Sequence, residues 1–357
     1  MDLILTLDYE LFGDGSGDIF TDLVEPTKKL LTICQTYNIK LTIFFEVVEY
    51  WKIKEEWDKG NKMGYKNNPI SAIEEQIIEA FQQGHDIQLH IHPQWLNATF
   101  KSGQWIVGNH WSMADIPLIK NNQFNITLDE VFQKGIQILE NMLKPIDNNY
   151  KCNIFRAGGF NILPSENIIK VLKKYHFIVD TSVFSGGYEH SIKSNYDYRK
   201  IHNKITYWPI KENNVLIQNT ETISKNDIIE ISIFSLPIYR IFKYDFTRIK
   251  AIFKNKHSAM QTIKGRTAKK SFLQKILFYF EKESLTWDFC LFNRKKMNYF
   301  YNKIQERKTT IYSPIVLIGH SKGFHSEDGL IFLTNKRNIN FQTMTEAYQK
   351  IKGQKNV

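Results

Sequence analysis

This sequence has few cysteines and no long apolar run. The three cysteines among its 357 residues, Cys34, Cys152 and Cys290, are odd in number and far apart, so they match neither a disulfide framework nor a zinc knuckle. No apolar run reaches the roughly 18 residues that a membrane-spanning helix needs. The first residues enter an apolar strand at once and lack the basic region and cleavage site of a signal peptide. We therefore expect a protein of the reducing cytoplasm.

Acidic residues are almost missing from one stretch, residues 238–280. The net charge of the chain is +10, and cations concentrate here, with Asp245 the only acid before Glu281. The cations are Arg240, Lys243, Arg248, Lys250, Lys254, Lys256, Lys264, Arg266, Lys269, Lys270 and Lys275. Because aromatic and aliphatic residues alternate with them, the stretch predicts basic amphipathic helices inserted into the fold.

This basic stretch has several interpretations. It could be the solvated face of ordinary helices. It could also be a peripheral platform on the inner face of the membrane, where anionic lipids attract each Lys or Arg by roughly 1 kcal/mol and apolar side chains enter the interface. The same charge would attract the phosphate of a lipid-linked or nucleotide-linked substrate. Nucleic acid is not expected as a partner, because no recognised nucleic-acid-binding motif accompanies the charge.

Strand and helix patterns alternate along the rest of the chain. Short apolar runs indicate buried strands at residues 3–7, 40–45, 87–89, 153–155, 177–179, 228–233 and 315–318. Helices are indicated at 26–37, from a capping box of Ser71 and Glu74 through 81, from a second box of Thr127 and Glu130, from Ser165 through 175, and from about Thr343 onward.

This alternation predicts an α/β fold, in which helices surround a parallel sheet. About seven strands of this kind favour a distorted (β/α)7-type barrel with a basic helical insertion. We expect a single domain, with residues 1–237 as the first part of the barrel, 238–300 as the insertion and 301–357 as the last part.

Polar residues follow five of the predicted strands. They are Asp8 and Glu10 after the first strand, His90 and His92 after the third, Arg156 after the fourth, Asp180 after the fifth and His320 after the last. Each alone has an ordinary explanation, as a cap, a loop residue, a turn former or a surface ion-pair partner. In a parallel barrel, however, the carboxyl ends of the strands converge on one mouth, where barrel enzymes hold their chemistry. We therefore expect these side chains to share one pocket.

Short motifs at these positions resemble those of the polysaccharide deacetylase (NodB-type) domain, carbohydrate esterase family four. The matching segments are LTLDYE at 5–10, TIFFE at 42–46, GHDIQLHIHP at 84–93, FRAGGF at 155–160, DTSV at 180–183 and IGH at 318–320. The resemblance covers about residues 1–190 and 305–352, in the family's order. The His-x-His-Pro variant resembles a subgroup associated with O-antigen and other surface-polysaccharide loci.

The resemblance implies a role for each matched residue. Asp8 matches the general base, and Arg156 matches the arginine that holds the base carboxylate. His320 matches the general acid that protonates the leaving amine, and Asp180 matches its carboxylate partner. His90 matches the first metal-binding histidine. The cofactor would be a divalent ion, expected to be zinc, although the ligand types alone do not select one metal.

The motifs depart from the family's pattern at the metal ligands. Tyr9 stands where the family has an aspartate ligand, and we expect Glu10, with its longer side chain, to take that role. Gln94 stands where the family has its second histidine; His92 is the expected substitute, and Gln94 stays an alternative. Two imidazoles at i and i+2 of an extended chain point the same way, so Glu10, His90 and His92 would give three ligands and one open position, as catalytic zinc sites have.

The resemblance implies a hydrolase that acts on the C–N bond of a linear amide. We expect it to remove an acetyl group from an N-acetylated sugar or glycan precursor in surface-polysaccharide biosynthesis, with a substrate linked to lipid or nucleotide. The chain could instead be an amidohydrolase acting on a small non-sugar amide. Because of Tyr9 and Gln94, it could also be a catalytically degenerate barrel that binds glycan or membrane.

Overall fold

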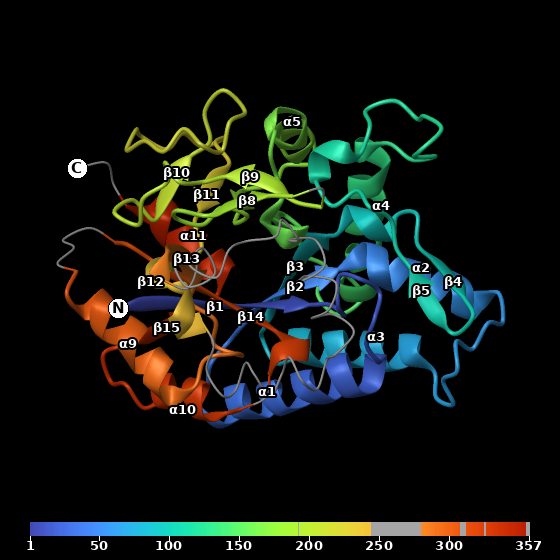
Figure 1. Ribbon diagram of the computed structural model, residues 1–357, viewed down its shortest axis with the longest axis horizontal. Coiled ribbons are helices and arrows are strands. Elements are labelled where there is room, and N and C mark those ends of the chain that lie inside the picture. Colours follow the sequence, from blue (N-terminus) through green and yellow to red (C-terminus); the bar gives the residue numbers. More distant parts are fainter. Residues whose placement is uncertain (192, 244–279, 308–311, 325, 355–357) are drawn as a thin grey trace.

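A curled sheet lies at the centre of the fold (Figure 1). The computed structural model describes residues 1–191, 193–243, 280–307, 312–324 and 326–354. The strands of the sheet are β1 (Asp2–Tyr9), β2 (Thr42–Glu46), β3 (Asp86–Ile91), β6 (Ile154–Ala157), β7 (Val179–Asp180), β10 (Tyr207–Pro209), β11 (Ile229–Ile231), β14 (Ile315–His320) and β15 (Asn340–Gln342). Their order is β10-β11-β7-β6-β3-β2-β1-β14, and β15 also pairs with β1. All of these pairs are parallel except β10 with β11.

The chain just after β11 links the two sides of this sheet. Ile233 forms one parallel bridge with Phe184 and another with Val316 of β14. The amide of Phe234 also donates a hydrogen bond of 2.9 Å to the carbonyl of Val316. The strands β1, β2, β3, β6, β7, β11 and β14 therefore curl into the distorted (β/α)7-type barrel that the sequence predicts.

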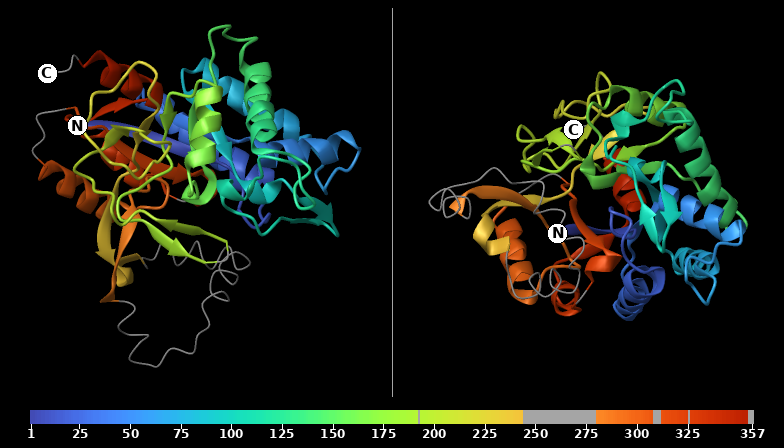
Figure 2. Two further views of the ribbon diagram at one scale, coloured as in Figure 1. Left: turned by 90° about the horizontal axis from the view of Figure 1, so that it is seen from above. Right: turned by 45° about the vertical axis from the view of Figure 1, so that its right-hand side comes forward.

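The barrel strands are apolar because both of their faces are buried. Every residue of β2 is buried, and so is every residue of β1 from Leu3 to Tyr9. Helices lie around the outside of the sheet (Figures 1 and 2). They are α1 (Glu25–Thr36), α2 (Val47–Asp58), α3 (Pro69–Gln82), α4 (Leu128–Leu143), α5 (Glu166–Lys174), α9 (Arg294–Gln305), α10 (Asp328–Thr334) and α11 (Met344–Gly353). The interior of the barrel thus tolerates polar residues only where they bind one another or a ligand.

Two predicted helix starts are confirmed. The capping box of Thr127 and Glu130 begins α4, with the threonine side chain bonded to the Glu130 amide and the glutamate bonded to the Thr127 amide. Thr343 caps α11 in the same way, together with Glu346. In both places the local sequence supplies partners for amides that no helix can satisfy internally.

The predicted capping box at Ser71 is wrong. Helix α3 begins two residues earlier, at Pro69, and the side chain of Asn68 accepts a hydrogen bond from the Ile70 amide. Proline suits the first position of a helix because its missing N–H would have no partner there. Ser165 precedes α5 as expected but makes no capping bond. Its hydroxyl instead donates to the Asn213 carbonyl over 3.0 Å.

Three antiparallel strand pairs stand apart from the main sheet. They are β4 (Thr99–Lys101) with β5 (Gln104–Ile106), β8 (Tyr188–His190) with β9 (Asn195–Asp197), and β12 (Ser235–Tyr239) with β13 (Lys282–Thr286). The last pair forms a ribbon that projects from the barrel (Figure 2).

Along the sequence, β12 precedes and β13 follows most of the predicted basic insertion. Residues 244–279 of that insertion lie outside the described residues, and the division at 238 and 300 stays a prediction. After the ribbon, Trp287 and Phe289 are buried in the core, and Asp288 bridges Ile318 of β14. None of the helices in the described ranges has the length and hydropathy needed to cross a membrane.

Candidate metal centre

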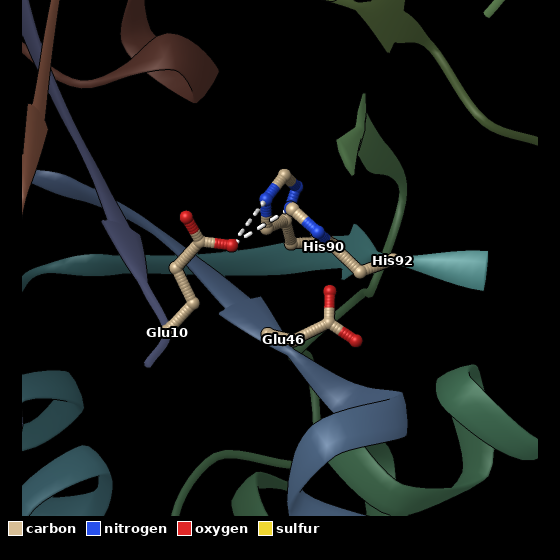
Figure 3. A group of neighbouring side chains, drawn as sticks. All are labelled: Glu10, Glu46, His90 and His92. Atoms are coloured by element: carbon tan, nitrogen blue, oxygen red, sulfur yellow. Dashed lines mark ion pairs between the residues drawn. The ribbon is translucent and has the colours of Figure 1, made fainter. Parts of the chain in front are cut away.

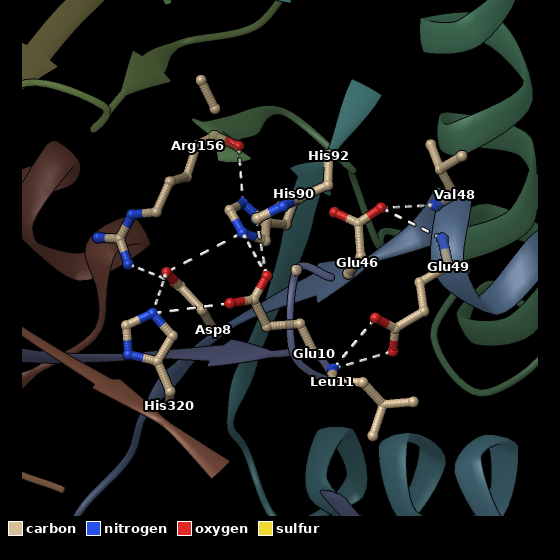
Figure 4. Close-up of polar contacts among 12 residues, drawn as sticks. Asp8, Glu10, Leu11, Glu46, Val48, Glu49, His90, His92, Arg156 and His320 are labelled. Carbon is tan, nitrogen blue, oxygen red and sulfur yellow. Dashed lines mark hydrogen bonds and ion pairs between the residues drawn. The ribbon is translucent and has the colours of Figure 1, made fainter. Parts of the chain in front are cut away.

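The predicted site residues all lie at the carboxyl ends of barrel strands. Asp8 and Glu10 come from the end of β1, His90 and His92 from the end of β3, Arg156 from β6, Asp180 from β7 and His320 from β14. Six of these side chains converge at one mouth, as Figure 4 shows, while Asp180 interacts with a different partner, Glu230. The parallel register explains this gathering, because it sets Asp8 opposite His320 and His90 opposite Arg156.

Alternation along β1 decides which of its polar residues face the site. Asp8 and Glu10 point to the same side, where the histidines are. Tyr9 points to the opposite side, where its hydroxyl donates to Gln76 of α3 over 2.9 Å and its ring stacks on Phe45. Tyr9 is therefore a packing residue in this fold, and Glu10 is the carboxylate that reaches the two imidazoles.

The core of the site is a buried group of one carboxylate and two imidazoles (Figure 3). Glu10 Oε2 lies 2.7 Å from His92 Nε2 and 3.4 Å from His90 Nε2. Glu46, at the end of β2, joins this group, so that ligand atoms of all four residues lie within 4.8 Å of one another. Glu46 was not predicted from the sequence as a site residue, although a charged residue directly after a buried apolar strand was the signal that identified Asp8.

The state of His90 fits a cation in this group. His90 Nδ1 lies 2.9 Å from the Arg156 carbonyl, which can only accept, so Nδ1 carries a proton, and in the neutral imidazole Nε2 has a free lone pair. That Nε2 is buried and has no hydrogen-bond partner among the described residues. It faces Glu10 Oε2, another atom with only lone pairs. With His90 neutral, two such atoms 3.4 Å apart need a positive charge between them, which a proton or a divalent ion can supply.

His92 is oriented from its other ring nitrogen. Its Nδ1 lies 2.8 Å from the side-chain amide of Gln94, whose Oε1 otherwise has no partner among the described residues. As placed, the Gln94 amide nitrogen also donates to the Gly13 carbonyl over 3.4 Å. Turning the amide would give up that bond, let the oxygen accept from Nδ1–H and leave Nε2 free to face Glu10. Burial lowers the pKa of His92 despite the opposing charge of Glu10, which favours the neutral, ligating form. A Cβ on Gly158 would lie 2.2 Å from the His92 ring, so this close approach requires glycine.

Asp8 is held by Arg156 through a buried ion pair. Arg156 Nη1 donates to Asp8 Oδ1 over 2.6 Å, and its Nε donates to the Thr181 carbonyl over 3.1 Å. Burial alone would raise the pKa of Asp8, but the charges of Arg156, His90 and His320 outweigh it and lower the pKa below its ordinary value. Asp8 is therefore an ionised carboxylate fixed in one orientation.

His320 and Lys322 approach the site from the end of β14. His320 Nε2 lies 3.6 Å from Asp8 Oδ2 and 3.7 Å from Glu10 Oε1. Lys322 Nζ lies 2.7 Å from Glu10 Oε1. Burial would raise the pKa of Glu10, but the charge of His92 in its protonated form, the charge of Lys322, and the hydrogen bonds that protonated imidazoles would donate lower it well below its ordinary value. Sequence reasoning missed Lys322, although it lies two residues after His320.

Asp180 has a partner that the sequence did not suggest. Its Oδ1 accepts from the Ser182 hydroxyl over 2.7 Å, and register places it beside Glu230 of β11. Both carboxyls are fully buried, and burial raises the pKa of each. Two buried carboxyls in contact share one proton rather than both ionise. In the described part of the chain His320 faces Asp8 and Glu10, so the expected Asp180–His320 pair is not seen.

Comparisons with known proteins give distant similarities of structure. No family profile matches the sequence, and no curated protein matches it. Solved structures do match the backbone of this protein. One is a protein from Mycobacterium smegmatis whose name assigns it to the polysaccharide deacetylases, with 12% identity, 100% of this chain and 91% of that chain covered, and a TM-score of 0.48.

Two further structures show similar values. A Pseudomonas aeruginosa PAO1 protein that is also named as a polysaccharide deacetylase has 11% identity, covers 98% of this chain and 89% of its own, and has a TM-score of 0.44. The allantoinase Puue has 11% identity, the same coverage of 98% and 89%, and a TM-score of 0.43. At these values the likeness by itself identifies neither the family nor the activity of this chain.

Proposed function

We propose that this protein is a metal-dependent hydrolase that removes the acetyl group from an N-acetylated sugar or glycan precursor. One observation carries the proposal: a buried group of Glu10, His90 and His92 lies beside an Arg-held carboxylate and a partly exposed histidine, all at one barrel mouth. Metal-assisted amide hydrolysis uses three components. They are a Lewis acid that polarises the carbonyl, a base that deprotonates the attacking water, and an acid that protonates the leaving amine. The deacetylase motifs in the sequence point to the same reaction.

Glu10, His90 and His92 are the residues proposed to hold the metal, with zinc as the expected ion. A divalent ion held there would polarise the amide carbonyl and make a water easier to deprotonate. Gln94 is proposed to act through His92, whose ring it contacts, rather than as a ligand. Lys322 would hold the second oxygen of Glu10 and keep that carboxylate in place.

Asp8 is the proposed base and His320 the proposed acid. Asp8 is ionised and fixed by Arg156, so it can take a proton from the attacking water. His320 lies next to Asp8, with 26% of its side chain exposed, where a substrate entering from solvent would meet it. Its proton would go to the amine nitrogen as the C–N bond breaks, giving acetate and a free amine. Asp180 would act on this arrangement through its interaction with the charge of Arg156 rather than through His320.

The setting is proposed to be surface-polysaccharide biosynthesis at the cytoplasmic face of the membrane. The basic stretch 238–280 supports a substrate that carries phosphate through a lipid or nucleotide. Phe242 and Phe280, on either side of the undescribed residues 244–279, are 63% and 59% exposed. Exposed aromatic residues beside clustered cations are typical of proteins that contact a membrane surface peripherally.

Acetate release by the metal-loaded protein tests the proposal. The substrates would be sugar nucleotides, lipid-linked sugars and chitooligosaccharides, each with its N-acetyl group. We expect Asp8→Asn to abolish turnover and keep the bound metal, because it removes the base and leaves the ligands. The matched control is Asp2→Asn, at the opposite end of β1, which should keep full activity.

Three results would count against parts of this proposal. Full activity of Asp8→Asn would show that another group is the base. A purified wild-type protein that takes up no divalent metal would remove the metal centre and favour a catalytically degenerate barrel. Metal uptake with acetate release only from small non-sugar amides would favour an amidohydrolase instead.

A further inference from the structure

The side chain of Glu46 uses only one of its two carboxylate oxygens within the protein. Glu46 ends β2 and stands at the N-cap of α2, where Oε1 accepts from the amides of Val48 over 3.0 Å and Glu49 over 3.3 Å. Its Oε2 is buried and has no hydrogen-bond partner among the described residues. The two capping bonds fix the carboxylate, so the direction of its free oxygen is fixed as well.

That carboxylate belongs to the group at the barrel mouth. A carboxylate oxygen of Glu46 lies within 4.8 Å of the ligand atoms of Glu10, His90 and His92. The register of β2 and β3 places Glu46 directly beside His90. Figure 3 shows the Glu46 carboxylate next to the two imidazoles, on the side away from Glu10.

Helix capping alone does not explain a glutamate at this position. The residues that cap helices best are Ser, Thr, Asp and Asn, whose short side chains reach the first amides directly. Glu46 is 2% exposed and lies near a second buried carboxylate, Glu49, which is 3% exposed. Lys322 contacts Glu10, and no cation among the described residues pairs with Glu46.

We propose that Glu46 is a fourth protein ligand of the divalent ion, in addition to Glu10, His90 and His92. This inference rests on the metal centre of the proposed function and extends it. Two carboxylates would neutralise the charge of the ion, and two imidazoles would complete the set. With four protein ligands, an open position for substrate requires an ion that accepts five or six ligands, so we expect Mn²⁺, Fe²⁺ or Co²⁺ to bind as well as Zn²⁺.

Glu49 provides a matched control for Glu46. It lies three residues away, at the start of the same helix, and it is equally buried. Both of its oxygens face the Leu11 amide, over 3.0 and 3.1 Å, and Glu49 is not in the group of candidate ligands at the barrel mouth. Replacing Glu49 by Gln therefore changes a buried carboxylate of the same kind without removing a proposed ligand.

Metal affinity of the full-length protein tests the inference directly. The metal-free wild type, Glu46→Gln, Glu49→Gln and Glu10→Gln would be titrated with Zn²⁺ and Mn²⁺ against a competing chelator, and the visible absorption of bound Co²⁺ would be recorded. We expect Glu46→Gln to weaken binding at least about tenfold, since residues that merely support ligands already cost that much. Its Co²⁺ spectrum should also change shape. Glu49→Gln should match the wild type, and Glu10→Gln should lose binding.

Equal affinity and an unchanged Co²⁺ spectrum for Glu46→Gln, with metal still bound by the wild type, would overturn this inference alone. A wild type that binds no metal would instead overturn the metal centre of the proposed function. If Glu46→Gln does not fold, Glu46→Asp decides, because it keeps the charge and a capping oxygen but withdraws the free oxygen from the group. Wild-type affinity for Glu46→Asp would then overturn the inference, and a tenfold loss would support it.

Discussion

At the scale of single residues, His320 has the most accessible ionisable side chain of the site. Its imidazole is 26% exposed, while the carboxylates of Asp8 and Glu10 that it faces are 4% and 6% exposed. A proton donor must meet the substrate, whereas a ligand is better enclosed. This difference in exposure is the physical reason for assigning His320 to acid catalysis and not to the metal.

We predict that His320→Ala lowers kcat about 10²- to 10⁴-fold, the usual contribution of a positioned acid, and leaves the metal content unchanged. Turnover and metal content of the same preparation would be measured together. Loss of the metal along with activity would show that His320 is a ligand.

The pair of Asp180 and Glu230 gives a prediction about stability and pH. Burial raises the pKa of Glu230 well above its ordinary value of 4.5, so the folded protein keeps a proton that the unfolded chain releases. The contribution of this proton to the free energy of unfolding is complete below pH 4.5 and is lost as the pH rises through the raised pKa. For one proton the slope is up to about 1.4 kcal/mol per pH unit.

We predict that the free energy of unfolding falls less steeply with rising pH in Glu230→Gln than in the wild type. The amide can donate to Asp180 in place of the shared proton, and its oxygen can still accept from the Val183 amide, which now bonds Glu230 over 3.0 Å. Free energies of unfolding in urea, measured between pH 5 and pH 8, would compare the variant with the wild type. Identical slopes for the two proteins would contradict a shared proton.

At the scale of elements, the sequence pattern and the structure assign different N-cap residues to α3. The local pattern favours Ser71 as the cap, whereas the structure gives that role to Asn68. We predict that Asn68→Ala lowers the free energy of unfolding by about 1 kcal/mol, the usual effect of losing an N-cap. Ser71→Ala should change it by less than about 0.5 kcal/mol or raise it, because alanine is the better helix former. Chemical denaturation of both variants measures these effects, and a larger loss for Ser71→Ala would place the cap at Ser71.

At the scale of the whole molecule, the net charge of +10 predicts how the protein responds to a surface of opposite charge. We expect co-sedimentation with vesicles that contain anionic lipid and none with zwitterionic vesicles. Binding should weaken steeply with salt, because screening shortens the range of the attraction. Replacing Lys264, Lys269 and Lys270 by Glu should reduce the bound fraction at least about tenfold, since each cation contributes roughly 1 kcal/mol.

A second triple variant controls for net charge. Lys28 and Lys29 of α1 and Lys295 of α9 are exposed and lie outside the basic stretch. Their replacement by Glu changes the total charge by the same amount as the first variant. Equal losses of vesicle binding in the two variants would show that total charge, and not the stretch 238–280, attracts the protein to the membrane.

The sequence by itself determined the strands of the barrel and the polar residues at their ends. A strand buried on both faces must be a short apolar run, and the first polar residue after it must lie at the mouth. For this reason Asp8, His90, Arg156 and His320 could be placed at one mouth without coordinates. The sequence did not indicate α2, whose first turn contains the buried Glu49 and whose cap is the glutamate Glu46.

Only the tertiary structure decided which of these side chains meet. Register between strands set Glu46 beside His90 and Asp180 beside Glu230, although the members of each pair are about 40 to 50 residues apart. The bridge from Ile233 to Val316 likewise joins strands far apart in the chain and brings the barrel's two sides together. Local sequence fixes the period and face of each element, because those depend on neighbouring residues. Contacts between elements depend on how all of the elements bury their apolar surface together, and no single segment contains that information.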